Sequence, residues 1–290
     1  MTLWLERHVP KLVLAPTFIA ILLFVYGFIA WTGWISLTKS RLMPKYDIEG
    51  FQQYDRLFAA PRWDVAMNNL YIFGALFIVI SMVLGLLLAI LLDQKIRTEG
   101  VLRTIYLYPM ALSMIVTGTA WKWILNPGLG LEKVVQGWGF ENFTFDWLVN
   151  PDYAIYTIVI AAVWQASGFV MALFLAGLRS VDTEIIKAAQ VDGIPTTRIY
   201  TAIIIPSMAP IFLSAFIVLS HLAIKSFDLV IAMTNGGPGY ATDLPATYMY
   251  AMAFSRGDLG QAASSAMIMM LVVFTIVVPY LYSELRTRND

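Results

Sequence analysis

The chain has 290 residues, of which 59% are hydrophobic and 13% charged, with a formal net charge of zero and a mean hydropathy of +0.71. Soluble domains carry about 25% charged residues, so this composition excludes an ordinary soluble enzyme. The lack of cysteine excludes disulfides, thiolate metal ligands and thiol nucleophiles. The balanced charge, with no basic run, excludes a nucleic-acid-binding surface.

Six apolar blocks of membrane-spanning length follow one another along the chain. A helix needs about 20 mostly apolar residues to cross about 30 Å of hydrocarbon, where its backbone groups must pair within the helix. The first block is longer than the apolar region of a secretory signal and lacks a small-x-small cleavage site, which favours an uncleaved span. We therefore predict an all-α polytopic membrane protein, with residues 1–290 in one transmembrane domain and spans near 12–35, 70–92, 106–125, 154–178, 203–224 and 266–282.

The distribution of lysine and arginine predicts the orientation of these spans. With the N-terminus inside, the inner segments hold ten such residues in 54 positions, whereas the outer segments hold eight in 103. This difference in density favours cytoplasmic N- and C-termini under the positive-inside rule. The first outer loop, 36–69, opposes the trend with five basic residues.

A polar hairpin separates the fourth and fifth spans at residues 184–206. Asp182 suits the N-cap of a short helix, and Glu184 lies in its first turn, near the positive end of the helix dipole. Gly193 suits the left-handed turn that ends such a helix, and Pro195 suits the start of a second one. One face of the first helix carries Ile185, Ala188 and Ala189. This pattern fits either a helix that docks in a partner's groove or an amphipathic elbow on the lipid surface.

Polar side chains interrupt the apolar run of the fourth span at Gln165 and Ser167, close to Phe169. Amide, hydroxyl and aromatic groups are suited to holding a sugar, because the polar groups pair with hydroxyls while the ring stacks on C–H surfaces. Glutamine and serine also join neighbouring helices in membranes. The residues alone support both interpretations.

The fifth span ends in a group of polar residues. Lys225 and Asp228 are spaced so that they can pair with each other, although charges near membrane depth usually face a cavity or a partner. His221 and Ser220, one turn deeper, suit either a contact with a neighbouring helix or one with a substrate. Beyond them, residues 236–239 read Gly-Gly-Pro-Gly and predict a turn. The small-residue stretches 74–85 and 168–177 are interpreted as helix-packing faces.

Four ordered motifs give nearly the whole chain a resemblance to a known family. The hairpin, with Ala188, Ala189, Asp192, Gly193 and a closing Ile203-Ile204-Ile205-Pro206, resembles the EAA loop of the permease subunits of binding-protein-dependent ATP-binding-cassette importers. Lys187 stands at the position of the family's glutamate. The three other motifs resemble carbohydrate-type permeases, and above all the shorter, glucose-type members: Arg103, Pro109, Trp121 and Trp123; Trp164, Gly168, Phe169 and 175–178; Phe227, Asp228, 233–238, Thr242, Tyr248, Tyr250, Ala253 and Phe254.

The resemblance implies a type I importer fold and a role for each motif. It implies that the hairpin contacts an ATPase through Glu184, Lys187, Ala188, Ala189, Asp192 and Gly193, with Lys187 in place of the family's acidic contact and Glu184 one turn earlier as a substitute for it. It implies that the sugar passes the fourth and fifth spans near Gln165, Ala166, Ser167, Phe169, Ser220 and Ser226. It implies that a soluble sugar-binding protein touches the external loop at Asn235, Gly236, Gly237 and Pro238.

The implied machine is an importer in the bacterial inner membrane that carries a carbohydrate, with a monosaccharide such as glucose as the best candidate. Its partners are a second permease, two ATPase subunits that bind ATP and Mg²⁺, and the binding protein. The chain itself is expected to hold no cofactor, metal site or catalytic residue. It has no Gly-Lys pair and hence no phosphate-binding loop, and it lacks the His-Glu-x-x-His and Gly-x-Ser-x-Gly motifs.

Two other classes of protein are weighed against this interpretation. A secondary carrier should show internal symmetry with broken, ion-binding helices, but the sequence has no repeat and no acid in the middle of a span. An intramembrane enzyme or receptor would need a reactive or ligand-binding constellation, which the sequence does not supply.

Overall fold

The computed structural model describes residues 2–94 and 96–287, which form helices joined by turns and loops. The described α-helices are α1 (Thr2–Ile21), α2 (Gly27–Ser36), α3 (Gln52–Phe58), α4 (Pro61–Asp93), α5 (Glu99–Leu107), α6 (Met114–Ile124), α7 (Leu131–Gly137), α8 (Ala154–Leu178), α9 (Thr183–Val191), α10 (Thr196–Ile199), α11 (Ile205–Ser207), α12 (Ala209–Ile224), α13 (Asp228–Met233), α14 (Pro245–Tyr250) and α15 (Leu259–Thr287). Single turns of π-helix at 22–26, 200–204 and 251–255 and of 3₁₀-helix at 108–111 join some of them.

Four helices in the described ranges are long and apolar enough to cross a bilayer, and there are six spans if two bent pairs each count as one. The apolar stretches Val13–Ser36 and Leu259–Tyr280 overlap most of the first and last predicted spans. The fourth predicted span, 154–178, coincides with α8. The second predicted span begins at 70, whereas α4 already begins at Pro61.

The third and fifth predicted spans are each broken into helices that meet at an angle. At the third, α5 and α6 meet at 100° across Pro109 and an extended Leu112. Ser113 then caps α6 by accepting a hydrogen bond from the Val116 amide (3.3 Å). At the fifth, α12 is bent by 66° from the helices that precede it, between Pro206 and Pro210. Proline has no N–H to donate to the preceding turn, so a helix kinks or breaks there.

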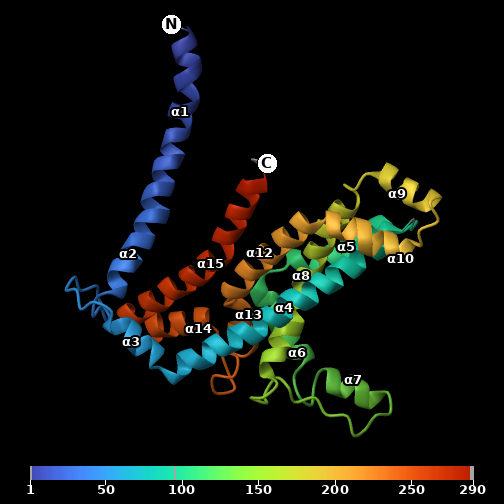
Figure 1. The fold of residues 1–290 in the computed structure, drawn as a ribbon. Coiled ribbons are helices and arrows are strands. Elements are labelled where there is room, and N and C mark those ends of the chain that lie inside the picture. The colour runs from blue at the N-terminus through green and yellow to red at the C-terminus, as the bar shows by residue number, and fades with distance from the viewer. Residues whose placement is uncertain (1, 95, 288–290) are drawn as a thin grey trace. The chain divides into compact units, whose positions relative to one another are not determined.

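The chain folds into two compact units, Met1–Trp63 with Tyr248–Leu271 and Asp64–Thr247 with Val272–Asp290. In the first unit, Trp63 packs edge-on against Tyr248 at 5.2 Å between ring centroids. The second unit holds the two bent pairs and α8. In it, the rings of Phe174 and Phe212 pack with 4.5 Å between their centroids. In this second unit, the hairpin of α9 and α10 lies at one end and α7 at the other (Figure 1). The single-domain organisation stays a prediction.

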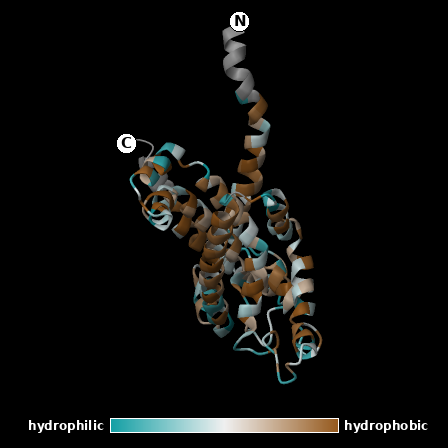
Figure 2. Cartoon of the chain, turned by 90° about the vertical axis from the view of Figure 1, so that its right-hand side faces the viewer, coloured by the Kyte–Doolittle hydropathy of each residue, from teal (hydrophilic) through white to brown (hydrophobic). Residues whose placement is uncertain are grey.

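Helices of the second unit approach each other through glycine, as the small-residue stretches predicted. A Cβ at Gly85 would come within 2.5 Å of Val170 Cγ1, and one at Gly168 would overlap the Tyr106 carbonyl. These close approaches fix α8 against α4 and α5. Brown, hydrophobic residues cover most of the long helices, while hydrophilic teal gathers at the connecting segments (Figure 2).

Candidate functional site

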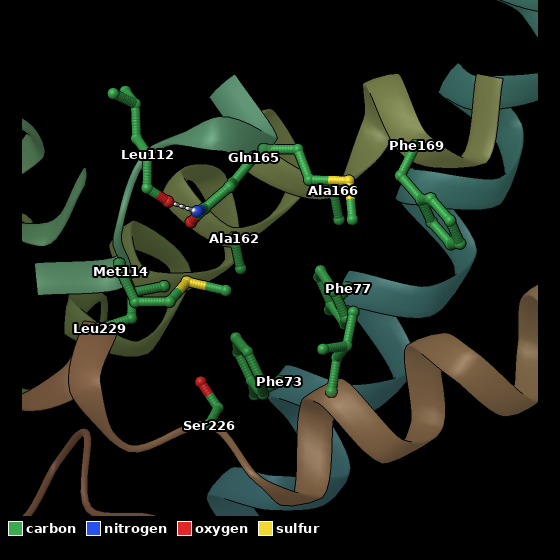
Figure 3. Close-up of a pocket in the computed structure, with 12 residues that line it drawn as sticks. Phe73, Phe77, Leu112, Met114, Ala162, Gln165, Ala166, Phe169, Ser226 and Leu229 are labelled. Carbon is green, nitrogen blue, oxygen red and sulfur yellow. Dashed lines mark hydrogen bonds between the residues drawn. The ribbon is translucent and has the colours of Figure 1, made fainter. Parts of the chain in front are cut away.

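A cavity of about 760 Å³, counted with the part that opens to solvent, lies among α4, the break between α5 and α6, α8, and the end of α12. Helix breaks matter here because they bring backbone carbonyls to a depth where intact helices show only side chains. Figure 3 shows Gln165 and Ala162 on one side of the space, with Phe73 and Ser226 across it. Its lining residues are Phe73, Phe77, Met110, Leu112, Met114, Ala162, Gln165, Ala166, Phe169, Leu222, Ser226 and Leu229.

Gln165 is the most informative polar group of this cavity. Its side chain is 5% exposed, and its Nε2 donates a hydrogen bond to the Leu112 carbonyl (2.8 Å), which the break in the third span has freed (Figure 3). The Oε1 atom of the same amide is buried and has no hydrogen-bond partner among the described residues. An unpaired buried acceptor costs about 1–3 kcal/mol. Gln165 therefore has a structural contact on one side and an unused acceptor on the other.

Two phenylalanines of α4 form an aromatic wall of the cavity. Phe73 and Phe77 stack with 5.5 Å between ring centroids and 2° between ring planes. They were not predicted as site residues, because a phenylalanine in an apolar run is typical of any membrane helix. Their spacing of four residues places them on one helix face, which was the one available signal.

The predicted pathway residues divide into two groups. Gln165, Ala166, Phe169 and Ser226 line the cavity described above, which is called the main cavity below. Ser167 does not; it is half-buried and directs its hydroxyl toward the Trp164 carbonyl (3.4 Å). Ser220 is also absent from this lining, since its hydroxyl donates to the Phe216 carbonyl (2.7 Å) and the residue borders a separate, smaller pocket with His221.

Lys225 and Asp228 border a second cavity, of about 450 Å³, next to the main one. The two cavities share four lining residues: Met114, Leu222, Ser226 and Leu229. Both charged side chains are exposed, and among the described residues neither forms an ion pair. The mutual pair considered from their spacing is therefore not formed, and both charges border the second cavity.

The polar hairpin has the capping that its sequence predicted. The Asp182 carboxylate accepts a hydrogen bond from the Glu184 amide (2.8 Å) at the start of α9. At the other end, Gly193 adopts φ +73°, its amide donates to the Gln190 carbonyl (3.1 Å), and the Ile194 amide donates to the Ala189 carbonyl (3.0 Å). This is a Schellman motif, in which the left-handed residue lets the chain leave the helix at a fixed angle.

The predicted contact residues of the hairpin face mainly outward. Glu184, Lys187, Ala188, Asp192 and Gly193 are exposed, whereas Ala189 is buried. The expected face of Ile185, Ala188 and Ala189 is thus split, because Ala189 points inward. The exposed apolar side chains beside the charged ones are Ile185 and Val191, the latter 88% exposed.

Arg179 joins three helix ends next to this hairpin. It caps the C-terminus of α8 and contacts Asp93 at the end of α4 (3.5 Å) and Glu99 at the start of α5 (2.8 Å). The hydrogen bond to Glu99 raises the pKa of the Arg179 guanidinium above its already high ordinary value. Arg179 is therefore a cation in any transport assay, and it connects the chain just before α9 to α5 and to α4, the helix that carries Phe73 and Phe77.

The Gly-Gly-Pro-Gly segment forms the expected turn. Asn235, Gly236 and Gly239 have left-handed φ values of 52°, 84° and 62°. The Thr242 hydroxyl closes the loop by donating to the Gly237 carbonyl (2.9 Å). Asn69 of α4 donates to the Asp243 carbonyl (3.0 Å) and so fastens the loop to α4. Of the four predicted contact residues, Asn235 is exposed, Gly237 and Pro238 are half-buried, and Gly236 is buried.

Known proteins resemble this chain in sequence and in fold. A probable ABC transporter permease protein of Pyrococcus horikoshii is 40% identical over 273 residues, covering 93% of this chain and 94% of that protein. The xylose/arabinose import permease protein XacH of Haloferax volcanii is 35% identical over 271 residues, covering 92% and 85%. The crystal structure of a bacterial ABC transporter involved in the import of the acidic polysaccharide alginate includes a chain of the same fold, with a TM-score of 0.85, 20% identity and 99% coverage of both chains.

The match to a family covers most of the chain. Residues 81–288 match the family described as binding-protein-dependent transport system inner membrane component. This confirms the resemblance inferred from the four motifs and the all-α membrane fold, and it makes the chain a multi-pass inner-membrane transport subunit rather than an ATPase. The chain belongs to the inner-membrane components of binding-protein-dependent ABC transport systems.

Proposed function

We propose that this subunit forms half of the pathway of an ATP-driven importer for a neutral carbohydrate, with a monosaccharide such as glucose as the best candidate. A soluble binding protein delivers the sugar on the outer face, and the loop Asn235–Pro238 contacts it. A second, related permease completes the pathway. Two ATPase subunits bind ATP and Mg²⁺ and engage the hairpin on the cytoplasmic face, where both termini of this chain also lie.

The observation that carries the substrate class is the buried, unpaired Oε1 of Gln165 in the cavity. A sugar hydroxyl that donates to this atom would satisfy it without disturbing the bond from Nε2 to Leu112. Phe73, Phe77 and Phe169 supply aromatic surface for the C–H faces of a sugar ring. Ser226 adds one hydroxyl that can both donate and accept.

The uncharged lining of the main cavity favours a neutral substrate. Among the described residues that line it, none is acidic, basic or histidine. An anionic substrate would leave its charge without a partner in an apolar space, which is strongly unfavourable. The named substrates of the relative XacH, xylose and arabinose, are neutral pentoses and agree with this inference.

Replacing Gln165 by leucine tests the pathway. We expect the variant to lower sugar uptake by reconstituted complexes about tenfold or more, because losing a buried hydrogen-bond partner costs about 1–3 kcal/mol and each 1.4 kcal/mol is about tenfold. Ser167→Ala is the matched control, since Ser167 lies two residues away on the same helix but outside the cavity. Unchanged uptake by Gln165→Leu, or an equal loss in Ser167→Ala, would contradict the proposed site.

In this proposal, the hairpin couples ATP hydrolysis by the ATPases to sugar transport. When the ATPases close on ATP, α9 moves with them and the permease shifts between inward- and outward-facing states, because ATP-bound ATPases bind one state better than the other. The exposed residues Ile185, Ala188 and Val191 give α9 an apolar contact stripe of a kind that docking requires. Lys187 would then meet an acidic group of the ATPase.

Arg179→Gln tests whether the ion cluster transmits this motion. Exposed ion pairs contribute only about 0–1 kcal/mol to folding, so the variant should unfold at nearly the wild-type temperature. We expect it to lower the number of sugars transported per ATP hydrolysed, because α9 loses its tie to α4 and α5. Arg179→Lys keeps the charge but not the forked geometry and should show a smaller loss. A normal transport ratio in Arg179→Gln would remove Arg179 from the coupling path.

A secondary carrier is the second candidate, and the two bent helix pairs are what favours it. Discontinuous helices near the midplane are typical of carriers driven by ion gradients. The family match supports the ATP-driven importer instead. Purification from native membranes separates the two, since an importer subunit should co-purify with a second permease and a stoichiometric ATPase, whereas a secondary carrier should not.

A further inference from the structure

The short helix α7, between α6 and α8, turns its apolar side outward. Leu131, Val134 and Trp138 follow the i, i+3, i+7 spacing of one helix face. Val134 is 51% exposed and Trp138 is 75% exposed. Leu129 and Phe140, which flank the helix, are exposed as well. The result is a group of exposed apolar side chains on a segment outside the predicted spans.

Hydrogen bonds on the other side of α7 hold this reversed arrangement. The Glu132 carboxylate accepts from the Phe145 amide (3.0 Å), and Gln136 Nε2 donates to the Phe143 carbonyl (2.9 Å). Glu132 and Gln136 are one turn apart and therefore share a face. The polar groups are thus used to bind the loop's own backbone, which forces the apolar residues to the surface.

The loop that carries α7 is fixed to the ends of α6 and α8. A Cβ at Gly130 would come within 2.5 Å of the Trp123 carbonyl oxygen, so the chain folds back directly onto the end of α6 before α7 begins. At the other end, Trp147 stacks on Tyr153, the residue before α8, with 5.5 Å between ring centroids. Trp123 itself is 71% exposed at the end of an apolar helix, as expected for an interfacial aromatic residue.

We propose that α7, with Leu129, Trp138 and Phe140, is an interfacial anchor that lies in the plane of the membrane surface. Exposed Leu131, Val134 and Trp138 on one face, with an exposed Lys133 away from it, are typical of helices that insert at the boundary of headgroups and acyl chains. Gly130 also brings the start of α7 directly onto the end of α6, where Trp123 is exposed. If this surface were instead a docking site for a soluble protein, its large apolar side chains would be left in water whenever that protein is absent.

The anchor would set the depth of α6, and Met114 at the start of α6 lines the main cavity. The inference depends on the membrane location of the chain and on the geometry of this loop. It does not depend on the identity of the transported substrate, so a failed sugar-uptake assay would leave it standing.

Single-cysteine spin labelling tests the proposal cleanly because the chain has no native cysteine. Val134→Cys puts a nitroxide on the apolar face of α7. Lys133→Cys is the matched control, because it puts the label on the neighbouring residue, away from the apolar face. In proteoliposomes of the assembled complex, power saturation with oxygen and a nickel chelate should report label 134 about 5–10 Å inside the headgroup boundary. Label 133 should report an aqueous position.

Two results would overturn the anchor. One is equal access of the nickel chelate to both labels. The other is protection of label 134 only after the soluble binding protein is added, which would identify a protein-docking surface. A measurement without a label guards against local disturbance: Trp138→Phe should remove tryptophan fluorescence that brominated lipids quench. If the lost fluorescence is instead the fraction quenched by aqueous iodide, the anchor is also wrong.

Discussion

Replacing Gly168 by alanine is expected to prevent α8 from seating against α5 and to lower the yield of folded protein sharply. The added Cβ would overlap the Tyr106 carbonyl oxygen and lie 2.7 Å from its carbon, and both atoms belong to the backbone. Overpacking usually costs about 1–3 kcal/mol. A backbone neighbour cannot rotate away, so we expect this variant at or above the upper end of that range. Thermal unfolding in detergent measures the loss.

Two other glycines give this experiment a graded series. At Gly177 a Cβ meets the ends of the Ile211 and Met208 side chains at 2.5 and 2.9 Å, which can shift, so Gly177→Ala should be milder. At Gly74 the nearest atom is 3.8 Å away. Gly74→Ala should be neutral or slightly stabilising, because alanine is favoured in helices. Gly168→Ala unfolding at the same temperature as Gly74→Ala would show that α8 and α5 do not pack this closely.

Replacing Gly193 by valine is expected to separate ATP hydrolysis from uptake. Gly193 has φ +73°, a conformation that β-branched residues avoid at a cost of about 1–3 kcal/mol. A Cβ there meets nothing within 4 Å, so the substitution acts on the backbone alone. The chain should fold and assemble, but α9 should leave its Schellman turn at a different angle. We expect sugar transported per ATP to fall about tenfold or more.

Gly50→Val is the matched control for this variant. Gly50 has nearly the same φ, +70°, and equally open surroundings, but it lies in the predicted first outer loop. The Gly50→Val substitution introduces the same strain away from the hairpin and should leave the coupling of ATP hydrolysis to uptake unchanged. Normal coupled uptake by an assembled Gly193→Val complex would show that the exit angle of α9 is not needed for coupling.

Much of the fold was predictable wherever local chemistry decides the structure. The run 154–178 contains no proline and forms one helix as predicted, and Asp182 and Gly193 bound α9 as their capping preferences indicate. The breaks in the third and fifth spans were missed because apolar composition averages over Pro109 and Pro206. Those prolines were the available signal, since each removes a backbone donor within an apolar run.

The candidate site was predictable only in part, for a physical reason. Gln165 stands out because polar groups are unusual within spans, whereas Ser226 was named only through the family resemblance. Phe73 and Phe77 do not stand out, because only the packing of α4 against α8 decides whether a phenylalanine faces lipid or a cavity. Ser220 was assigned to the pathway by the family resemblance, but its hydroxyl bonds the Phe216 carbonyl one turn back, as serines in membrane helices commonly do.

The central claim is that this subunit carries a neutral sugar past Gln165 in a complex driven by ATP. The most direct test is sugar accumulation in proteoliposomes that hold both permeases and the ATPases, with ATP enclosed and the binding protein outside. We predict that uptake of a neutral monosaccharide requires ATP and the binding protein, and that it is lost in Gln165→Leu but kept in Ser167→Ala. Uptake that continues without ATP and follows an imposed ion gradient would contradict this claim and identify a secondary carrier.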